Sequence, residues 1–118
     1  MREIRKKKIE SLLKREISSV IMKELKDPRV GLVAVNEVSL TNDLRTAHVY
    51  FTAVGGEKER KAALAGLKNA AGFIRKKAGA DIRLRYNPEL IFSPDEKAEE
   101  RQRVLSLLKT IGEEKEND

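Results

Sequence analysis

Apolar residues recur at helical spacing over the first quarter of the chain. They lie three or four positions apart, as one buried face of a helix requires, at Ile9, Leu12, Leu13, Ile17, Val20, Ile21 and Leu25. Pro28 disfavours helical geometry at the residue before it, Asp27. The pattern therefore predicts one long helix over residues 3–26.

Two runs rich in Val, Leu and aromatic residues come next. Residues 31–40 are dominated by Val and Leu. Residues 44–54 alternate between two faces, one of which carries Arg45, Ala47, Val49, Phe51 and Ala53. The polar connection at residues 41–43 is a turn signal. Two adjacent strands with a short polar connection are typical of an antiparallel hairpin.

The middle of the chain predicts two short helices separated by a bend. Residues 57–70 show helical spacing, and residues 73–78 continue it after Ala70, Ala71 and Gly72. A glycine inside a helical pattern costs about 1 kcal/mol relative to alanine. These three small residues are therefore expected to form an interhelical kink.

A third strand is predicted just after this helix pair. Ile82, Leu84 and Tyr86 alternate with Arg83 and Arg85, which is typical of a strand over residues 82–86. Residues 90–92 extend it beyond Pro88.

A final helix is expected to begin at Ser93, which acts as its N-cap in the run Ser93-Pro94-Asp95-Glu96. Its apolar stripe, which Arg101 interrupts, is formed by Ala98, Val104, Leu105, Leu108 and Ile111. The predicted order is α-β-β-α-α-β-α, a single α+β domain over residues 1–111 whose helices cover a small sheet. Residues 112–118 are expected to form a flexible acidic tail.

The charge of the chain is uneven. There are 25 Lys and Arg against 19 Asp and Glu, a net charge of +6, and the last seven residues carry four acids and one base. Residues 1–111 therefore carry +9, which favours a polyanionic partner such as nucleic acid. The alternative is a Lys-rich surface that only solvates the protein. An anionic membrane is less favoured, because the basic segments lack the bulky aromatics of an interfacial anchor.

The residues that carry most enzyme chemistry are missing or isolated. The chain has no Cys and a single histidine, His48, on the polar face of a predicted strand. Zinc-site spacings and glycine-rich phosphate loops are absent, and no nucleophile, base and oxyanion donor come together. We expect a protein that is not an enzyme and binds no metal or cofactor. The longest apolar run is far shorter than the ~20 residues of a membrane span.

Two basic segments are candidates for contacts with phosphates. Their members are Arg5, Lys6, Lys7, Lys8, Lys14 and Arg15 on the first helix, and Lys68, Arg75, Lys76, Lys77, Arg83 and Arg85 around and after the bend. A junction of small residues lets a phosphate backbone approach, and the N-terminus of a second helix offers free N–H groups. The alternative is a plain helix corner with solubilising charges. With three Phe, two Tyr and no Trp, base stacking is disfavoured as the dominant mode.

The order α-β-β-α-α-β with a bend between its second and third helices is that of a type II KH domain. KH domains carry GxxG at the bend, whereas this chain has Ala70-Ala71-Gly72. In this departure the chain closely resembles the ribosome-binding factor A family, whose fold has an Ala-x-Gly kink. Further matches are the segments 26–29, 47–51 and 72–75 and the PELxFxxD pattern from Pro88 to Asp95. The resemblance covers residues 4–108.

The resemblance implies a non-enzymatic, cytoplasmic protein that binds the free small (30S) ribosomal subunit. We also expect the protein to be a monomer. Such proteins assist late maturation of 16S rRNA, including the region of its 5′-terminal helix. They are linked to growth in the cold, and an assembly GTPase helps to release them. No membrane partner is implied.

Two other functions stay open at this point. The same fold could serve a general binder of single-stranded RNA or DNA, against which the missing GxxG and the scarce aromatics weigh. A protein–protein adaptor that uses the long first helix would bind its partner at high salt and leave RNA alone.

Overall fold

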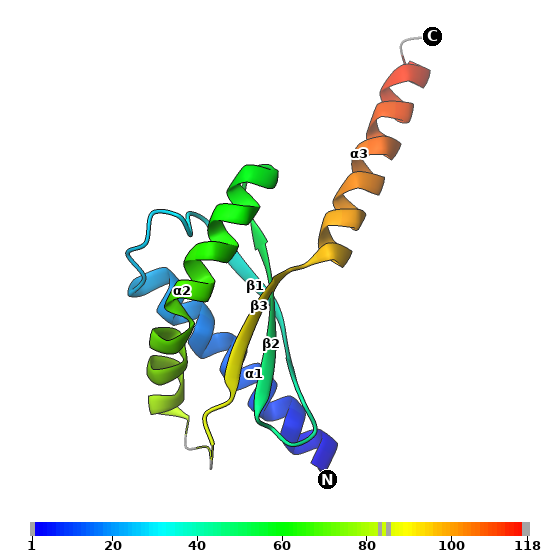
Figure 1. The fold of residues 1–118 in the computed structure, drawn as a ribbon. Helices are drawn as coiled ribbons and strands as arrows, with labels where there is room; N and C mark the ends of the chain where they lie inside the picture. Colours follow the sequence, from blue (N-terminus) through cyan, green and yellow to red (C-terminus); the bar gives the residue numbers. More distant parts are fainter. Residues whose placement is uncertain (1, 83, 85, 117–118) are drawn as a thin grey trace.

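The computed structural model describes residues 2–82, 84 and 86–116 (Figure 1). Its three helices and three strands confirm the predicted α+β class. In chain order they are α1 (Arg2–Lys23), β1 (Val33–Leu40), β2 (Thr46–Ala53), α2 (Glu57–Asp81), β3 (Glu89–Pro94) and α3 (Glu96–Glu116).

The strands form one sheet in the order β1-β2-β3. The predicted hairpin is confirmed, since β1 and β2 are antiparallel, with Val33 opposite Ala53 and Leu40 opposite Ala47. β3 runs parallel to β2. Parallel strands need a long crossover connection, and α2 supplies it.

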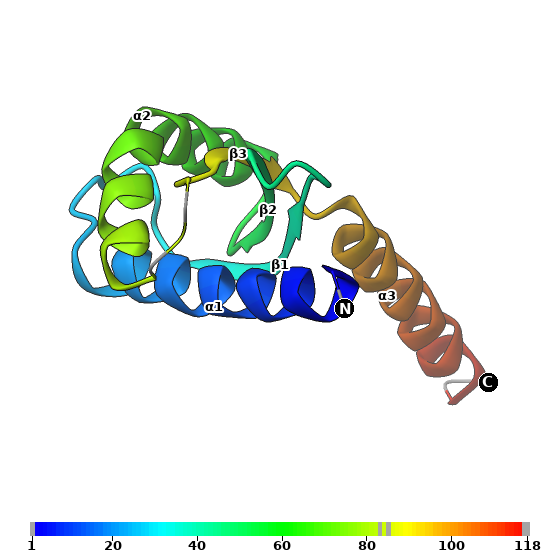
Figure 2. The ribbon, with the colours of Figure 1, turned by 90° about the horizontal axis from the view of Figure 1, so that it is seen from below.

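Both long helices of the body cover the same face of this sheet. α1 packs against β1, α2 packs against β3, and the two helices pack against each other (Figure 2). The largest fully buried side chains are Phe51, Leu13, Ile17, Leu67, Ile74 and Val49. The other face of β2 carries Thr46, His48 and Tyr50, which are half-buried. The sheet therefore has one apolar side and one side open to solvent.

The predicted pair of short helices is wrong, because α2 is a single helix from Glu57 to Asp81. Figure 2 shows that α2 changes direction along its length without ending. An isolated glycine lowers helix propensity by only about 1 kcal/mol, which the buried Leu67 and Ile74 on either side offset.

The tightest glycine contact in α2 lies elsewhere. A Cβ added at Gly66 would lie 2.8 Å from Cγ2 of Val30, whereas one added at Gly72 would meet nothing within 4 Å. Gly66 is therefore the position where α2 approaches the turn that follows α1.

The strand predicted over residues 82–86 is also wrong. Ile82 ends α2, and the described residues of that segment, Ile82, Leu84 and Tyr86, lie outside any strand. β3 begins at Glu89, and its register with β2 sets Leu90 opposite Ala47 and Phe92 opposite Val49. Residues 90–92, predicted as an extension, are thus the strand itself. Five alternating residues fit an irregular segment as well as a strand, and pairing with β2 decides between them.

The N-cap of α3 is Asp95 and not Ser93, which belongs to β3. The Ala98 amide donates to Oδ1 of Asp95 at 3.2 Å. α3 then stands away from the sheet (Figure 1) and does not cover it. Its apolar stripe is exposed, with Val104, Leu105, Leu108 and Ile111 between 48% and 60% accessible. α3 also continues through Gly112 to Glu116, so no structural break separates the expected tail from the domain.

None of the described helices is long and apolar enough to cross a lipid bilayer.

Candidate nucleic-acid interface

The first candidate surface follows α1. Because Ile9, Leu13 and Ile17 are buried, the opposite side of the helix must face solvent. The exposed surface of α1 outside this buried stripe carries Arg5, Lys7, Lys8, Lys14 and Arg15, all predicted, together with Lys23. Lys6 is half-buried, and its Nζ donates to Oδ1 of Asn42 at 3.3 Å. We call the exposed basic residues at positions 5, 7, 8, 14, 15 and 23 the α1 strip.

The second candidate surface lies on α2, where Lys68, Lys76 and Lys77 are exposed. Nζ of Lys77 lies 3.9 Å from Oε1 of Glu24 and 5.9 Å from the ring centroid of Phe73. Part of its charge is thus already paired. Lys76 is exposed one position before it.

Arg75 has a structural role that the sequence did not reveal. Its Nε donates to the carbonyl oxygens of Asn87 and Pro88, each at 3.1 Å, and its Nη2 also donates to Asn87. The side chain therefore ties α2 to the segment that leads into β3. A substitution of Arg75 would change this link as well as any contact with RNA.

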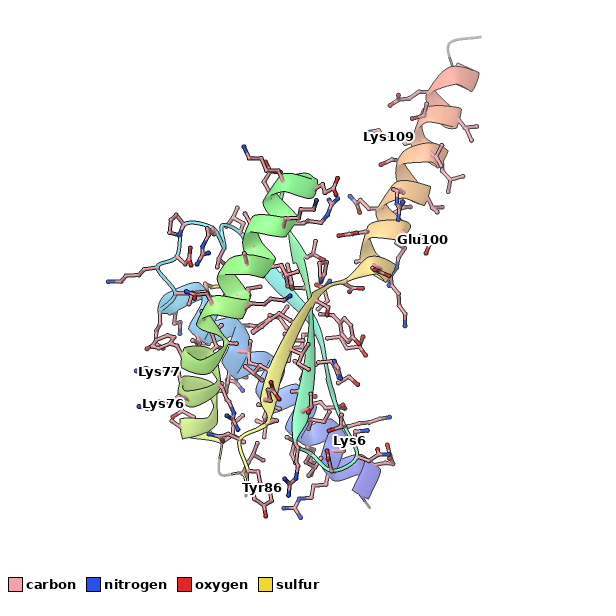
Figure 3. All side chains as sticks on the ribbon, in the orientation of Figure 1. Lys6, Lys76, Lys77, Tyr86, Glu100 and Lys109 are labelled. Atoms are coloured by element: carbon pink, nitrogen blue, oxygen red, sulfur yellow. The ribbon has the colours of Figure 1, made fainter. Side chains whose placement is uncertain are left out.

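Lys76 and Lys77 lie near the C-terminal end of α1. Lys77 pairs with Glu24 just beyond the C-terminus of α1, about 27 Å from Lys6 at ~1.5 Å of rise per residue. Figure 3 shows the same separation between Lys6 and the pair Lys76 and Lys77. The predicted residues are therefore spread along α1 and α2 and do not converge on one pocket. Arg83 and Arg85, also predicted, lie outside the described residues.

The predicted kink does not provide the expected anion site. Ala70 and Ala71 are half-buried and Gly72 is exposed, as a close approach would allow. However, α2 is continuous here, so the backbone N–H groups bond within the helix and are not free for a phosphate.

Sequence reasoning missed a groove beside the N-terminus of α1. It lies between Arg5 and Lys6 of α1, the β1–β2 connection and the segment before β3, which contributes Tyr86. Cζ of Arg45 lies 5.3 Å from the ring centroid of Tyr86. One signal was available: Arg45 is the single charged residue on the face of the second predicted strand that otherwise carries core residues.

The β1–β2 connection that carries Arg45 is tightly hydrogen-bonded. The Thr41 hydroxyl lies 2.6 Å from Oδ1 of Asp43, which also accepts from the Arg45 amide at 3.1 Å. Leu44 adopts a φ of 62°, which is rare for a branched side chain, and its amide donates to the Thr41 carbonyl. The Thr41 hydroxyl and the Arg45 amide lower the pKa of Asp43. This network holds the backbone of Arg45 in place and so sets the position from which its side chain extends toward Tyr86.

The part of the chain that the structure describes contains no group of three or more His, Cys, Asp or Glu side chains able to hold a metal ion. His48 is half-buried on the open face of the sheet.

The fold and the charge distribution define a small basic α+β protein with an extended cationic surface. Its sequence matches the family model of ribosome-binding factor A over residues 5–108. It is 43% identical to ribosome-binding factor A of Halothermothrix orenii over 118 residues, which cover all of this chain and 97% of that protein. The corresponding protein of Dictyoglomus thermophilum is 39% identical over 115 residues, 97% of this chain and 96% of that protein. The chain belongs to the ribosome-binding factor A family.

Solved structures agree with this assignment. The crystal structure of ribosome-binding factor A from Thermus thermophilus is similar with a TM-score of 0.68 and 32% identity, covering 75% of this chain and 94% of that one. A homology model of the Thermus thermophilus protein, fitted into the cryo-EM map of its complex with the 30S subunit, is similar with a TM-score of 0.62 and 32% identity. It covers 73% of this chain and 90% of that model.

Proposed function

We propose that this protein is a non-enzymatic assembly factor that binds the free small ribosomal subunit through phosphates of 16S rRNA. The α1 strip carries the proposal, because it presents six exposed cations along one helix, which can attract the repeated negative charge of an RNA backbone. The Thermus thermophilus relative fitted into a 30S complex supports the choice of particle. Lys6, Lys68, Lys76 and Lys77 extend this surface.

The finer parts of the proposal follow the family resemblance. The protein assists late maturation of 16S rRNA, including the region of its 5′-terminal helix, and supports growth in the cold. It acts in the cytoplasm as a monomer, takes no cofactor, and is released with the help of an assembly GTPase. Its fold is related to a type II KH domain. The two helices that flank the bend in such a domain correspond here to the single helix α2.

The mechanism is binding without any bond made or broken. The basic surface holds one arrangement of the RNA more tightly than competing arrangements. Only this difference in affinity can supply free energy for remodelling. The role of the protein therefore depends on how its cations match one RNA conformation.

The test is sedimentation of the purified protein with small subunits, large subunits and joined ribosomes across a salt series. We expect co-migration with free small subunits only. If about six phosphates are contacted, log affinity falls with log salt at a slope of about −4 to −5. Equal binding to every particle would leave only non-specific RNA affinity. Binding that is insensitive to salt would instead favour a protein–protein adaptor.

A further inference from the structure

The groove beside the N-terminus of α1 combines apolar and cationic walls. Ile9, Leu40, Leu44 and Leu84 line it together with Arg5 and Lys6. Purely electrostatic contact with an RNA backbone needs no apolar surface. A nucleotide, by contrast, presents an apolar base face and an anionic phosphate side by side.

Tyr86 adds an aromatic ring at the edge of this groove. Tyr86 is 51% exposed. The Arg45 guanidinium lies 5.3 Å from the ring centroid, within the range of a cation–π contact. Figure 3 places Tyr86 and Lys6 at the same end of the body. An aromatic ring beside an arginine plane is the arrangement on which unpaired RNA bases stack.

We infer that this groove binds one unpaired RNA nucleotide, with its base stacked on Tyr86 and its phosphate held by Arg5 and Lys6. The inference rests on the proposed RNA-binding function and adds a base-stacking subsite to it. The base can stack on the face of the Tyr86 ring that Arg45 leaves open. It can also displace the Arg45 guanidinium and stack on the face that the guanidinium covers. Apolar side chains of the groove cover the edge of the base.

Two acidic side chains of the groove predict a preference among bases. Glu3 and Asp43 line it and can only accept hydrogen bonds when ionised. Adenine and cytosine each carry an exocyclic amino group that donates. We therefore expect single-stranded RNA rich in adenine and cytosine to bind this subsite better than poly-uridine.

The absence of Trp from the chain allows a direct test. Tyr86→Trp introduces a single indole that keeps the stacking surface, and a base stacked on it quenches its fluorescence. The titrants are small subunits, a short single-stranded oligoribonucleotide of mixed sequence, and a fully paired RNA duplex. Tyr50→Trp, on the open face of the sheet, is the matched control. We expect small subunits and the single strand to quench only the reporter at position 86, and the duplex to quench neither.

The affinity of two further variants of Tyr86 for small subunits gives a second readout. Tyr86→Phe keeps the ring, whereas Tyr86→Leu keeps only apolar bulk. We expect Tyr86→Phe to bind small subunits like the wild type and Tyr86→Leu to bind them about five- to a hundred-fold more weakly. Thermal unfolding of both variants is measured alongside, and an unchanged transition would show that the fold is intact.

The inference and the proposed function fail in different ways. If the wild type binds small subunits, position 86 is not quenched and Tyr86→Leu binds normally, the stacking subsite is wrong and the proposed function stands. If the wild type does not bind small subunits but the single strand still quenches the fluorescence of Trp at position 86, the proposed function is wrong and the stacking subsite stands. Equal quenching by the duplex, or at position 50, would overturn the subsite.

Discussion

Asn36 and Asp95 join the middle of β1 to the start of α3. Nδ2 of Asn36 lies 2.9 Å from Oδ2 of Asp95, and the same nitrogen donates to the Thr52 hydroxyl at 2.7 Å. Asn36 falls at the register shift between Val35 and Glu37, where β1 carries one extra residue. Such a bulge turns a side chain out of the regular alternation. Here it directs an amide to the residue that caps α3.

This relationship predicts that Asp95, and not Ser93, controls the start of α3. We expect Asp95→Ala to destabilise the N-terminal turn of α3 by about 0.5–2 kcal/mol, because a cap acceptor is lost. Hydrogen exchange should become faster from residue 97 onward, while the body keeps its protection. Ser93→Ala is the control and should leave the exchange of α3 unchanged. Faster exchange in Ser93→Ala alone would restore Ser93 as the cap.

The exposed stripe of α3 predicts a contrast between two leucine substitutions. Leu108 is 60% accessible, whereas Leu67 of α2 is fully buried. Leu67→Ala should lower the free energy of unfolding by about 2–5 kcal/mol, as for other core positions. Leu108→Ala should lower it by less than about 0.5 kcal/mol, as for most surface sites. Urea unfolding measures both. A large loss in Leu108→Ala would mean that α3 packs against the core in solution.

Two glycines of α2 predict opposite effects of alanine. In Gly66→Ala the new Cβ would clash with Val30, so we expect a loss of about 1–3 kcal/mol in stability. In Gly72→Ala the new Cβ meets nothing and the helix is continuous, so stability should rise by up to about 1 kcal/mol. Thermal unfolding of the two variants compares them directly. A destabilised Gly72→Ala would show that the bend of α2 requires glycine at position 72.

Three aspartates predict how stability changes in acid. The Arg29 side chain lowers the pKa of Asp27, the Thr41 hydroxyl lowers the pKa of Asp43, and the Asn36 amide lowers the pKa of Asp95. A carboxyl with a lower pKa when folded stabilises the fold above its ordinary pKa of 3.8, and this contribution is lost as the pH falls through the lower value.

We therefore expect the free energy of unfolding to be constant near neutral pH and to fall below about pH 4. Urea unfolding as a function of pH measures this, and Asp43→Asn should reduce the slope on the acid side. A stability that rises as the pH falls below 4 would contradict these contacts.

The hydrophobic pattern predicts most of the body correctly. The long α1 and the hairpin of β1 and β2 follow from spacing that repeats over many residues, which makes their assignment robust. The start of β3 could not be predicted, because Leu84 and Tyr86 alternate as well as Leu90 and Phe92 do. Only the pairing of Leu90 and Phe92 with β2 distinguishes them.

Sequence spacing predicts the face of a helix but not whether another element covers it. Apart from Arg101 the stripe of α3 keeps helical spacing like that of α1, yet α3 leaves the body after Asp95. The candidate site shows the same limit. Basic residues can be counted in the sequence, but the hydrogen bonds of Arg75 to residues 87 and 88 and the contact of Arg45 with Tyr86 depend on the tertiary fold.

The most direct test of the account compares two charge-matched variants in the same sedimentation assay. Lys7→Glu with Lys14→Glu changes the α1 strip, and Lys97→Glu with Lys109→Glu makes the same change in charge at exposed positions on α3. We expect only the first variant to lose affinity for small subunits, and its salt slope to become shallower by about one per lost phosphate contact. Equal losses in both variants would contradict the account, because net charge and not the α1 strip would then determine binding.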